Sequence, residues 1–174
     1  MQALYRTSDL MLGDPGIDSQ HERVLESMHQ LRSAIERGRP REETLGWLDA
    51  FAGIVAWHFS SEAELMRSAA YPDAAAHISE HRQLFEQLTL ARSEFAAGNI
   101  RSCGALALFA QVWTAQHIRD ADRRLAEFLK TGPVPAGDRP ALNSEAPTAR
   151  RLEPSVPGHV SSVIATPNSL PVVH

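Results

Sequence analysis

Residues 54–88 read IVAWHFSSEAELMRSAAYPDAAAHISEHRQLFEQL. Apolar side chains recur every three or four residues on both sides of Pro72, near the middle of this stretch. That spacing is typical of α-helices that bury one face, whereas a β-strand would alternate with a period of two. Proline cannot continue a helix, so Pro72 separates two helices here. The stretch therefore predicts a pair of long helices joined by a short turn.

The same recurrence continues before and after this pair and predicts four helices in all. They span approximately residues 19–38, 41–71, 72–98 and 102–130. Asp18 is a possible N-cap of the first helix, and Pro72 suits the first turn of the third. Links this short favour antiparallel neighbours. The predicted fold class is an all-α, up-down-up-down antiparallel four-helix bundle.

The composition changes near residue 131. Eight of the 11 prolines lie in residues 131–174, and this segment has no aromatic residue. A segment that is punctuated by proline and has no aromatic side chain to bury does not pack as helix or sheet. We therefore predict one domain, the helical bundle of residues 1–130, followed by a disordered tail or linker at residues 131–174.

Charge and cysteine content limit the class of protein. The formal net charge of −4 leaves no basic surface for nucleic acid. No stretch approaches the roughly 18 apolar residues of a membrane span, and the N-terminus lacks the pattern of a secretory signal. The single cysteine, Cys103, excludes an internal disulfide and a zinc or iron–sulfur site built from cysteines. These features predict a cytoplasmic protein with no membrane span.

Five histidines and two carboxylates stand out because they lie in four separate stretches at helix-compatible spacings. They are His21, His58, Glu62, His77, His81, His117 and Asp122. Residues four apart on a helix differ by only about 40° around its axis, so each pair within 58–62 and 77–81 shares one face. These two faces, and the face of His21, also carry the apolar residues of their helices. The sequence therefore directs three of the four sets into the bundle interior.

A single inward histidine is more often a core residue than a metal ligand, and one such pair adds little. Here every predicted helix contributes at least one ligand-type side chain. Burying all seven groups without a partner would cost several kcal/mol for each uncompensated group, and a metal removes that cost. Imidazole nitrogens with carboxylate oxygens suit borderline metals such as iron. Seven ligands are too many for one ion with an open position, but they suit two ions that share the carboxylates.

The fourth helix leaves one assignment open. His117 and Asp122 are five residues apart, about 140° on a regular helix, whereas Asp120 is only about 60° from His117. Either Asp122 reaches around the helix, or the helix carries a π-type widening, a feature that tends to occur at functional sites. Spacing alone does not decide between the two aspartates.

Several short motifs together resemble one known family. They are His58-Phe59-Ser60-Ser61-Glu62 followed by Met66, Tyr71-Pro72, His77, His81 and Phe85; Leu12-Gly13 leading through Ile17-Asp18 to Gln20-His21; and Trp113 before His117-Ile118, with Asp122 after them. The pattern resembles the hemerythrin signature, and specifically that of the bacterial hemerythrins. The resemblance covers roughly residues 5–130 and fills all seven ligand positions.

The resemblance implies a non-haem di-iron centre. One iron would be held by His77, His81 and His117, and the other would have only His21 and His58. Two carboxylates and an oxo or hydroxo group would bridge the ions. The two-histidine iron would then keep the open position, where O2 binds.

The bridging carboxylates implied by the resemblance are Glu62 and Asp122, which selects Asp122 over Asp120. The implied function is reversible O2 binding, in an oxygen carrier, store or delivery protein rather than an enzyme. One alternative is an O2- or redox-sensing module that signals to a partner through the tail. Another is a di-iron enzyme that consumes peroxide or NO. The expected partners are O2 and a protein that receives it or its signal, such as an O2-consuming enzyme.

Three residues around His117 are expected to form the O2 pocket, namely Trp113, Thr114 and Ile118. Thr114 occupies a position where the family usually has leucine. Its hydroxyl either donates a hydrogen bond into the pocket or admits water there, or it bonds back to a helix carbonyl. Our hypothesis is that the threonine makes oxidation of the O2-loaded form faster than a leucine would.

Overall fold

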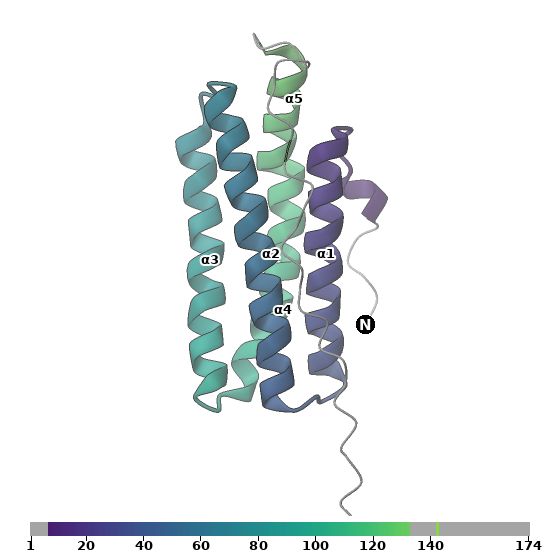
Figure 1. Cartoon of the computed structure of the whole chain (residues 1–174), viewed down its shortest axis with the longest axis vertical. Helices are drawn as coiled ribbons and strands as arrows, with labels where there is room; N and C mark the ends of the chain where they lie inside the picture. Colours follow the sequence, from purple (N-terminus) through teal and green to yellow (C-terminus); the bar gives the residue numbers. More distant parts are fainter. Residues whose placement is uncertain (1–6, 133–141, 143–174) are drawn as a thin grey trace, which may run out of the picture.

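The structure is a computed structural model and describes residues 7–132 and residue 142. The elements in chain order are η1 (Thr7–Leu10), α1 (Pro15–Glu36), α2 (Arg41–Ser68), α3 (Ala74–Ala96), α4 (Ile100–His117), the π-helix η2 (Ile118–Asp122) and α5 (Arg123–Thr131). Four long rods run side by side, each packed against its neighbours in the order α1, α2, α3, α4 and back to α1 (Figure 1). The predicted all-α, antiparallel four-helix bundle is confirmed.

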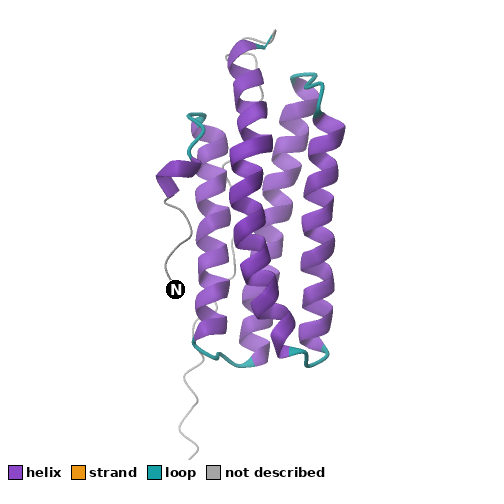
Figure 2. Cartoon of the chain, turned by 180° about the vertical axis from the view of Figure 1, so that it is seen from behind, coloured by secondary structure: helices purple, strands orange, loops and turns teal. Residues whose placement is uncertain are grey.

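The fourth rod is built from three consecutive elements. Because α4, η2 and α5 follow one another without a break, they form one continuous helical rod (Figure 2). No strand occurs in the described part of the chain. Within that part, none of the helices has the length and apolarity needed to cross a membrane. The predicted tail falls almost entirely on residues 133–141 and 143–174, which lie outside the described residues.

The first helix begins earlier than the sequence predicted. Its N-cap is Asp14, whose side chain accepts hydrogen bonds from the backbone N–H groups of Gly16 and Ile17 at 3.0 and 3.2 Å. Asp18 was therefore the wrong choice of cap, because its carboxylate turns back to accept from the N–H groups of Leu12 (2.7 Å) and Gly13 (2.9 Å). The missed signal was the proline that follows Asp14, since proline is favoured at the first helical position.

Three helices end in the same backbone motif. After α1, the N–H of Gly38 donates to Ile35 O and the next N–H donates to Ala34 O, with Gly38 at φ 61°. This paired pattern is the Schellman motif, which places one residue in the left-handed region. Gly98 fills the same position after α3, at φ 102°. After α2 the position is occupied by Ala70, at φ 50°.

The bundle interior has two apolar clusters. One contains Leu31, Phe51 and Leu84, and the other contains Met66 and Leu125. On α1 and α2 the buried histidines and Glu62 lie between the part of the helix that joins the first cluster and the part that joins the second, and on the fourth rod Gln111 and Thr114 lie between the two parts in the same way. The bundle therefore holds a polar layer with a dry core on either side of it.

Candidate metal centre

All seven ligand-type residues predicted from the sequence meet in this polar layer, and each is at most 5% exposed. They form two groups that share their carboxylates: one contains Glu62, His77, His81, His117 and Asp122, and the other contains His21, His58, Glu62 and Asp122. In each group, one ligand atom per residue lies within 4.8 Å of all the others. The structure thus divides the five histidines three to two.

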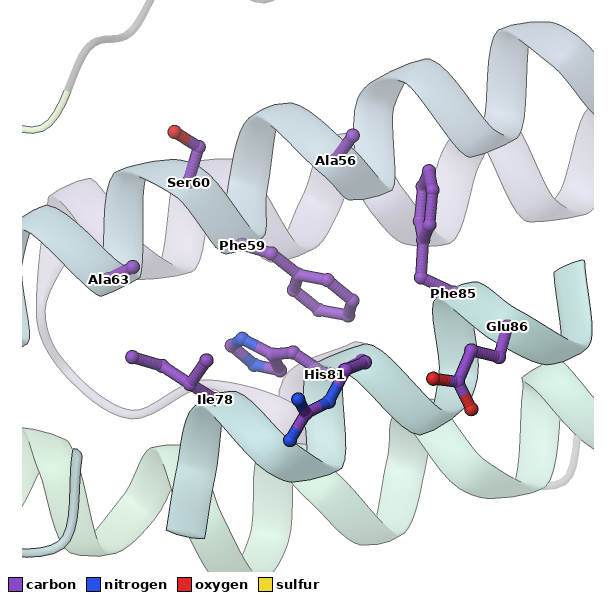
Figure 3. A pocket seen from close by; sticks show the side chains of 9 residues that line it. Ala56, Phe59, Ser60, Ala63, Ile78, His81, Phe85 and Glu86 are labelled. Atoms are coloured by element: carbon purple, nitrogen blue, oxygen red, sulfur yellow. The ribbon is translucent and has the colours of Figure 1, made fainter. Parts of the chain in front are cut away.

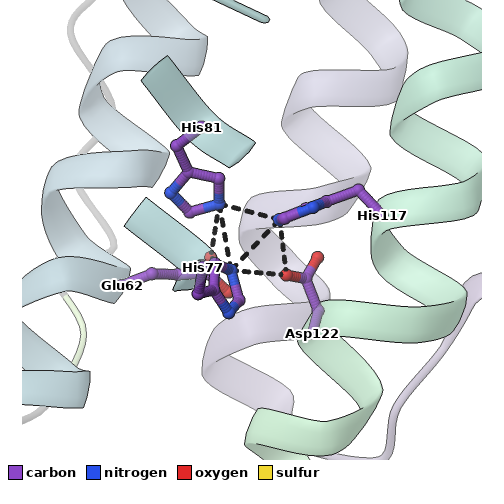
Figure 4. Close-up of side chains that lie close together, drawn as sticks. All are labelled: Glu62, His77, His81, His117 and Asp122. Atoms are coloured by element: carbon purple, nitrogen blue, oxygen red, sulfur yellow. Dashed lines mark hydrogen bonds and ion pairs between the residues drawn. The ribbon is translucent and has the colours of Figure 1, made fainter. Parts of the chain in front are cut away.

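The three-histidine group has a geometry that hydrogen bonding does not explain. The Nε2 atoms of His77, His81 and His117 form a triangle with sides of 2.8, 3.0 and 3.1 Å (Figure 4). A ring nitrogen that carries a proton cannot also accept one, so three such atoms cannot all hydrogen-bond to one another. Three nitrogens on adjacent octahedral corners, each about 2.1 Å from a metal, would be about 3.0 Å apart. The triangle therefore has the size of one face of a metal's coordination shell.

Asp122 faces both groups at once. Its Oδ1 lies 3.1 Å from Nε2 of His77 and 3.1 Å from Nε2 of His117, while its Oδ2 lies 3.0 Å from Nε2 of His21. The two oxygens of one carboxylate are thus directed at different histidine sets, as a bridging ligand requires.

Glu62 makes the second link between the groups. Its Oε2 lies 3.4 Å from Nε2 of both His77 and His81, and 3.8 Å from Nε2 of His58. Neither carboxylate oxygen of Glu62 or of Asp122 has a partner with hydrogen-bond geometry within the described residues. Buried carboxylates are otherwise hydrogen-bonded or metal-bound, so these orphaned oxygens fit a cation between them.

The π-helix η2 accounts for the spacing that the sequence left open. It covers Ile118–Asp122, directly after His117. A π-helix accommodates an additional residue in its turn, so side chains five apart come close to one face. Asp122 is consequently buried in the centre, whereas Asp120 is exposed. Of the two alternatives, the structure contains the widened helix.

The charges of the site favour neutral ligands at two positions. Burial lowers the pKa of His58 to about 4, with only partial compensation from Glu62. Burial lowers the pKa of His81 far below its ordinary value, and the charges of His117 and His77 lower it further. Both rings are therefore neutral at pH 7. A neutral imidazole is the form that binds metal.

Two other histidines have the opposite shift because of the carboxylates. Burial alone would lower the pKa of His77, but Asp122 and Glu62 outweigh it and raise the pKa to about 9. The pKa of His21 is likewise raised, since Asp122 outweighs burial. Burial would raise the pKa of Asp122, yet the neighbouring histidines hold it well below its ordinary value. A cation entering the centre would take the place of the protons on His77 and His21.

Comparison with known proteins agrees with this geometry. Residues 13–129 match the family model described as "Hemerythrin HHE cation binding domain". The chain belongs to the hemerythrin family. A bacteriohemerythrin of Stenotrophomonas maltophilia is 31% identical over 130 residues, which is 75% of this chain and 84% of the relative. Bacteriohemerythrins of Pseudomonas aeruginosa (28%, covering 75% and 84%) and Ralstonia nicotianae (26%, covering 74% and 90%) are similar to it as well.

Membership of the hemerythrin family and the buried His/Glu/Asp cluster together make this a metal site.

Aromatic rings cover two of its histidines. Phe59 stacks on His81, with ring centroids 3.7 Å apart and planes at 7°, and Trp113 stacks on His117 at 4.4 Å and 14°. These rings fix the orientation of the imidazoles and keep water from their faces.

A groove between α2 and α3 reaches the imidazole ring of His81, one of the two rings that an aromatic side chain covers (Figure 3). Its volume is about 350 Å³, and its walls are Ala56, Phe59, Ser60, Ala63, Ile78, His81, Arg82, Phe85 and Glu86. The lining is largely apolar, and His81 lies at the inner end. The groove reaches the three-histidine group, whereas His21 and His58 do not line it.

The predicted pocket residues lie within four positions of His117 along the fourth rod, and Trp113 stacks on its ring. Thr114 and Ile118 are buried, and Trp113 is half-buried. The hydroxyl of Thr114 has no hydrogen-bond partner among the described residues. The alternative in which it bonds back to a helix carbonyl is therefore wrong. A buried, unsatisfied hydroxyl is costly, so it is available to a ligand or a water molecule.

Sequence reasoning assigned no role to two polar residues that touch the ligands, although one of them, Gln20, stands in a motif quoted for the resemblance. Glu80 contacts Nδ1 of His117, and Gln20 contacts Nδ1 of His58. Each directly precedes a histidine of the cluster, His81 or His21. This repeated position was the signal that could have identified Glu80 and Gln20, because a polar residue that directly precedes a buried ligand in the sequence lies close to the site.

Proposed function

We propose that this protein binds O2 reversibly at a non-haem di-iron centre, as an oxygen carrier, store or delivery protein. The observation that carries the proposal is the unequal pair of donor groups. One group offers five donor residues and the other four, and both include the same two carboxylates. Two ions that share Glu62 and Asp122 would therefore differ in the number of protein ligands by one.

The proposed ligand assignment follows from that division. His77, His81 and His117 would hold one iron, and His21 and His58 the other. An oxo or hydroxo group would be the third bridge. The position on the two-histidine side is the one without a protein donor, so the exchangeable ligand would bind there. When bound, the two irons supply the electrons that make O2 binding possible and reversible.

The chain itself would provide a dry, rigid pocket. Trp113, Thr114 and Ile118 would form its wall on the fourth rod, with the Thr114 hydroxyl as the free donor. The apolar clusters on either side exclude water from the ions. Exclusion of water limits loss of an electron and a proton to solvent, which is what reversible binding needs.

The donor set favours a carrier over an enzyme. Di-iron enzymes and ferritins use about four carboxylates with Glu-x-x-His pairs, whereas this site has two carboxylates and five histidines. Anionic donors stabilise higher oxidation states of iron, and a histidine-rich set stabilises them less. The lone, buried Cys103 favours a reducing compartment, so we include a cytoplasmic location in the proposal.

The test is an anaerobic titration of the reduced, iron-loaded protein with O2. We expect two irons per chain, a charge-transfer band in the visible that develops with one O2 per chain, and loss of that band under argon. Asp122→Asn is expected to lose the second iron and the band, while Asp120→Asn, at the exposed neighbouring position, keeps both. One iron per chain, or bleaching with turnover of added peroxide or NO, would refute the proposal and favour an enzyme.

A further inference from the structure

In two of the cluster histidines, the ring nitrogen that faces away from the cluster contacts a polar side chain. Nδ1 of His117 lies 2.9 Å from Oε2 of Glu80, and Nδ1 of His58 lies 3.1 Å from Oε1 of Gln20. His117 belongs to the three-histidine group and His58 to the two-histidine group. Each group therefore has one ligand with a fixed outer partner, and the two partners differ in charge.

The arrangement is repeated on two pairs of helices. Glu80 precedes His81 on α3 and reaches His117 on α4, while Gln20 precedes His21 on α1 and reaches His58 on α2. In both cases the residue before one ligand holds the ligand of the next helix. Gln20 is 1% exposed, whereas the Glu80 side chain is 42% exposed. The buried position carries the neutral amide, and the position that water reaches carries the carboxylate.

These contacts fix which nitrogen of each ring carries the proton. Nε2 of His117 faces the cluster, so Nδ1–H donates to the Glu80 carboxylate, and Nδ1–H of His58 donates to the Gln20 amide oxygen in the same way. A hydrogen bond to a carboxylate is about twice as strong as one to a neutral acceptor. The hydrogen bond to Glu80 also increases the negative charge on Nε2 of His117. His117 is thereby the stronger donor to a metal, and His58 the weaker.

We propose that Glu80 and Gln20 are positioning residues that make the two metal positions unequal. Glu80, acting through His117, strengthens the three-histidine position and favours the more highly charged ion there. Gln20, acting through His58, orients the ring without adding charge and leaves the two-histidine position weaker. This inference rests on the proposed two-metal centre, but it does not depend on O2 binding.

The experiment is a Co2+ titration of the full chain, followed by the visible absorption of the bound ion. Glu80→Gln keeps the size of the side chain and removes its charge. We expect it to weaken one of the two Co2+ equivalents by about tenfold and to leave the other unchanged. Glu94→Gln, which removes the same charge from the exposed face of α3 outside the groove that reaches His81, is the matched control and should match the unsubstituted chain.

The reciprocal change tests the other position. Gln20→Glu should tighten the Co2+ equivalent that Glu80→Gln leaves unchanged. If that variant does not fold, Gln20→Met, whose thioether sulfur is only a weak acceptor, should weaken the same equivalent by about tenfold. A further readout is the reduction of the iron-loaded protein, in which Glu80→Gln should make the ferric ion that is harder to reduce about tenfold easier to reduce, about 59 mV for one electron.

The outcomes separate this inference from the proposed function. If Glu80→Gln and Glu94→Gln give the same Co2+ affinities and the same reduction behaviour, Glu80 has only a structural role and the inference fails. If Glu80→Gln weakens both equivalents equally, the claimed selectivity fails. If the unsubstituted chain binds only one Co2+, the two-metal centre itself is wrong, whatever the variants do.

Discussion

Thr114 stands three residues before His117, at a position where the resemblance to the hemerythrin signature implies leucine. Its hydroxyl is buried and has no partner among the described residues, which costs about 1–3 kcal/mol. Valine has nearly the same shape and no hydroxyl. We expect Thr114→Val to raise the free energy of unfolding of the metal-free protein by about 1 kcal/mol, measured by urea denaturation.

The same residue gives a kinetic prediction for the loaded protein. A hydroxyl in the pocket attracts water and donates a hydrogen bond, and both favour oxidation of the O2-loaded form. Thr114→Leu is therefore expected to lengthen the lifetime of the charge-transfer band in air, and Thr114→Ser, which keeps the hydroxyl, to leave it short. An unchanged lifetime in Thr114→Leu would contradict this role.

At the residue level, residue type and spacing pointed to six members of the cluster, and the resemblance to the hemerythrin signature selected Asp122 over Asp120 as the seventh. The sequence was not enough to assign a role to Glu80 or Gln20. Their role depends on reaching a histidine of a neighbouring helix, which requires the rotation of each helix about its axis. It was also wrong about Asp18, because the choice between two nearby aspartates as N-cap depends on where Pro15 starts the helix.

The π-helix is the element that brings Asp122 into the centre. A π-turn is equivalent to an α-turn with one inserted residue, so deleting one exposed residue from it should restore a regular helix without rotating its two ends. We expect deletion of Asp120 to retain both metal equivalents and to leave the melting temperature equal or higher. Deletion of Gln116, before His117, should instead rotate His117 out of the centre and lose metal.

If removing Asp120 abolishes metal binding, the widened turn is not what places Asp122. Metal content and Co2+ absorption of the purified variants give the answer directly. The sequence could state the alternatives here but not choose between them. The energetic difference between a π-turn and a side chain that reaches around a regular helix depends on the packing of Ile118 and Leu125 on either side.

The end of α2 offers a separate test of stability. Ala70 adopts φ 50° in the position that glycine fills after α1 and α3. The side chain of an L-residue there costs about 1 kcal/mol, and Ala70 is exposed, so no packing is lost with its Cβ. Ala70→Gly is expected to raise the free energy of unfolding by about 0.5–1 kcal/mol in urea denaturation.

The control for this change is Ala97→Gly. Ala97 is also exposed at a helix end but has φ −73°, so glycine there only adds freedom to the unfolded chain and should lower stability slightly. If both substitutions lower stability, strain at Ala70 is not relieved by glycine.

Helix ends such as these were predictable within a few residues from Gly38, Gly98 and Pro72, because turns demand those residue types.

At the scale of the whole molecule, a layer of buried charge separates two apolar cores. Without a metal, His77 and His21 compensate the carboxylates by holding protons, so folding of the metal-free protein depends on pH. The folded-state pKa of His77, about 9, is above the ordinary value of 6.5. Its contribution to stability is fully present below pH 6.5 and is lost as the pH rises through 9, a change on the order of 3 kcal/mol.

His58 acts in the opposite direction on the acid side. Its folded-state pKa of about 4 is below 6.5, so the unfolded chain takes up a proton first as the pH falls, and stability decreases toward pH 4. The metal-free protein should therefore be most stable near pH 6.5. Calorimetric melting in chelator across pH 4–9 measures this, and His29→Gln, at an exposed histidine outside the cluster, should leave the profile unchanged.

Metal loading should oppose the loss of stability that the metal-free protein shows between pH 6.5 and pH 9. A bound cation requires His77 without its proton, so metal affinity rises over the same range in which the metal-free protein loses stability. At a fixed Co2+ concentration, about 100 times the dissociation constant at pH 6.5, binding adds about 2.7 kcal/mol at that pH, and the increase in melting temperature should grow from pH 6.5 to pH 9. A metal-induced increase that stays constant or shrinks over this range would mean that the protons on His77 and His21 are not what the metal displaces, and that the layer is compensated by other groups.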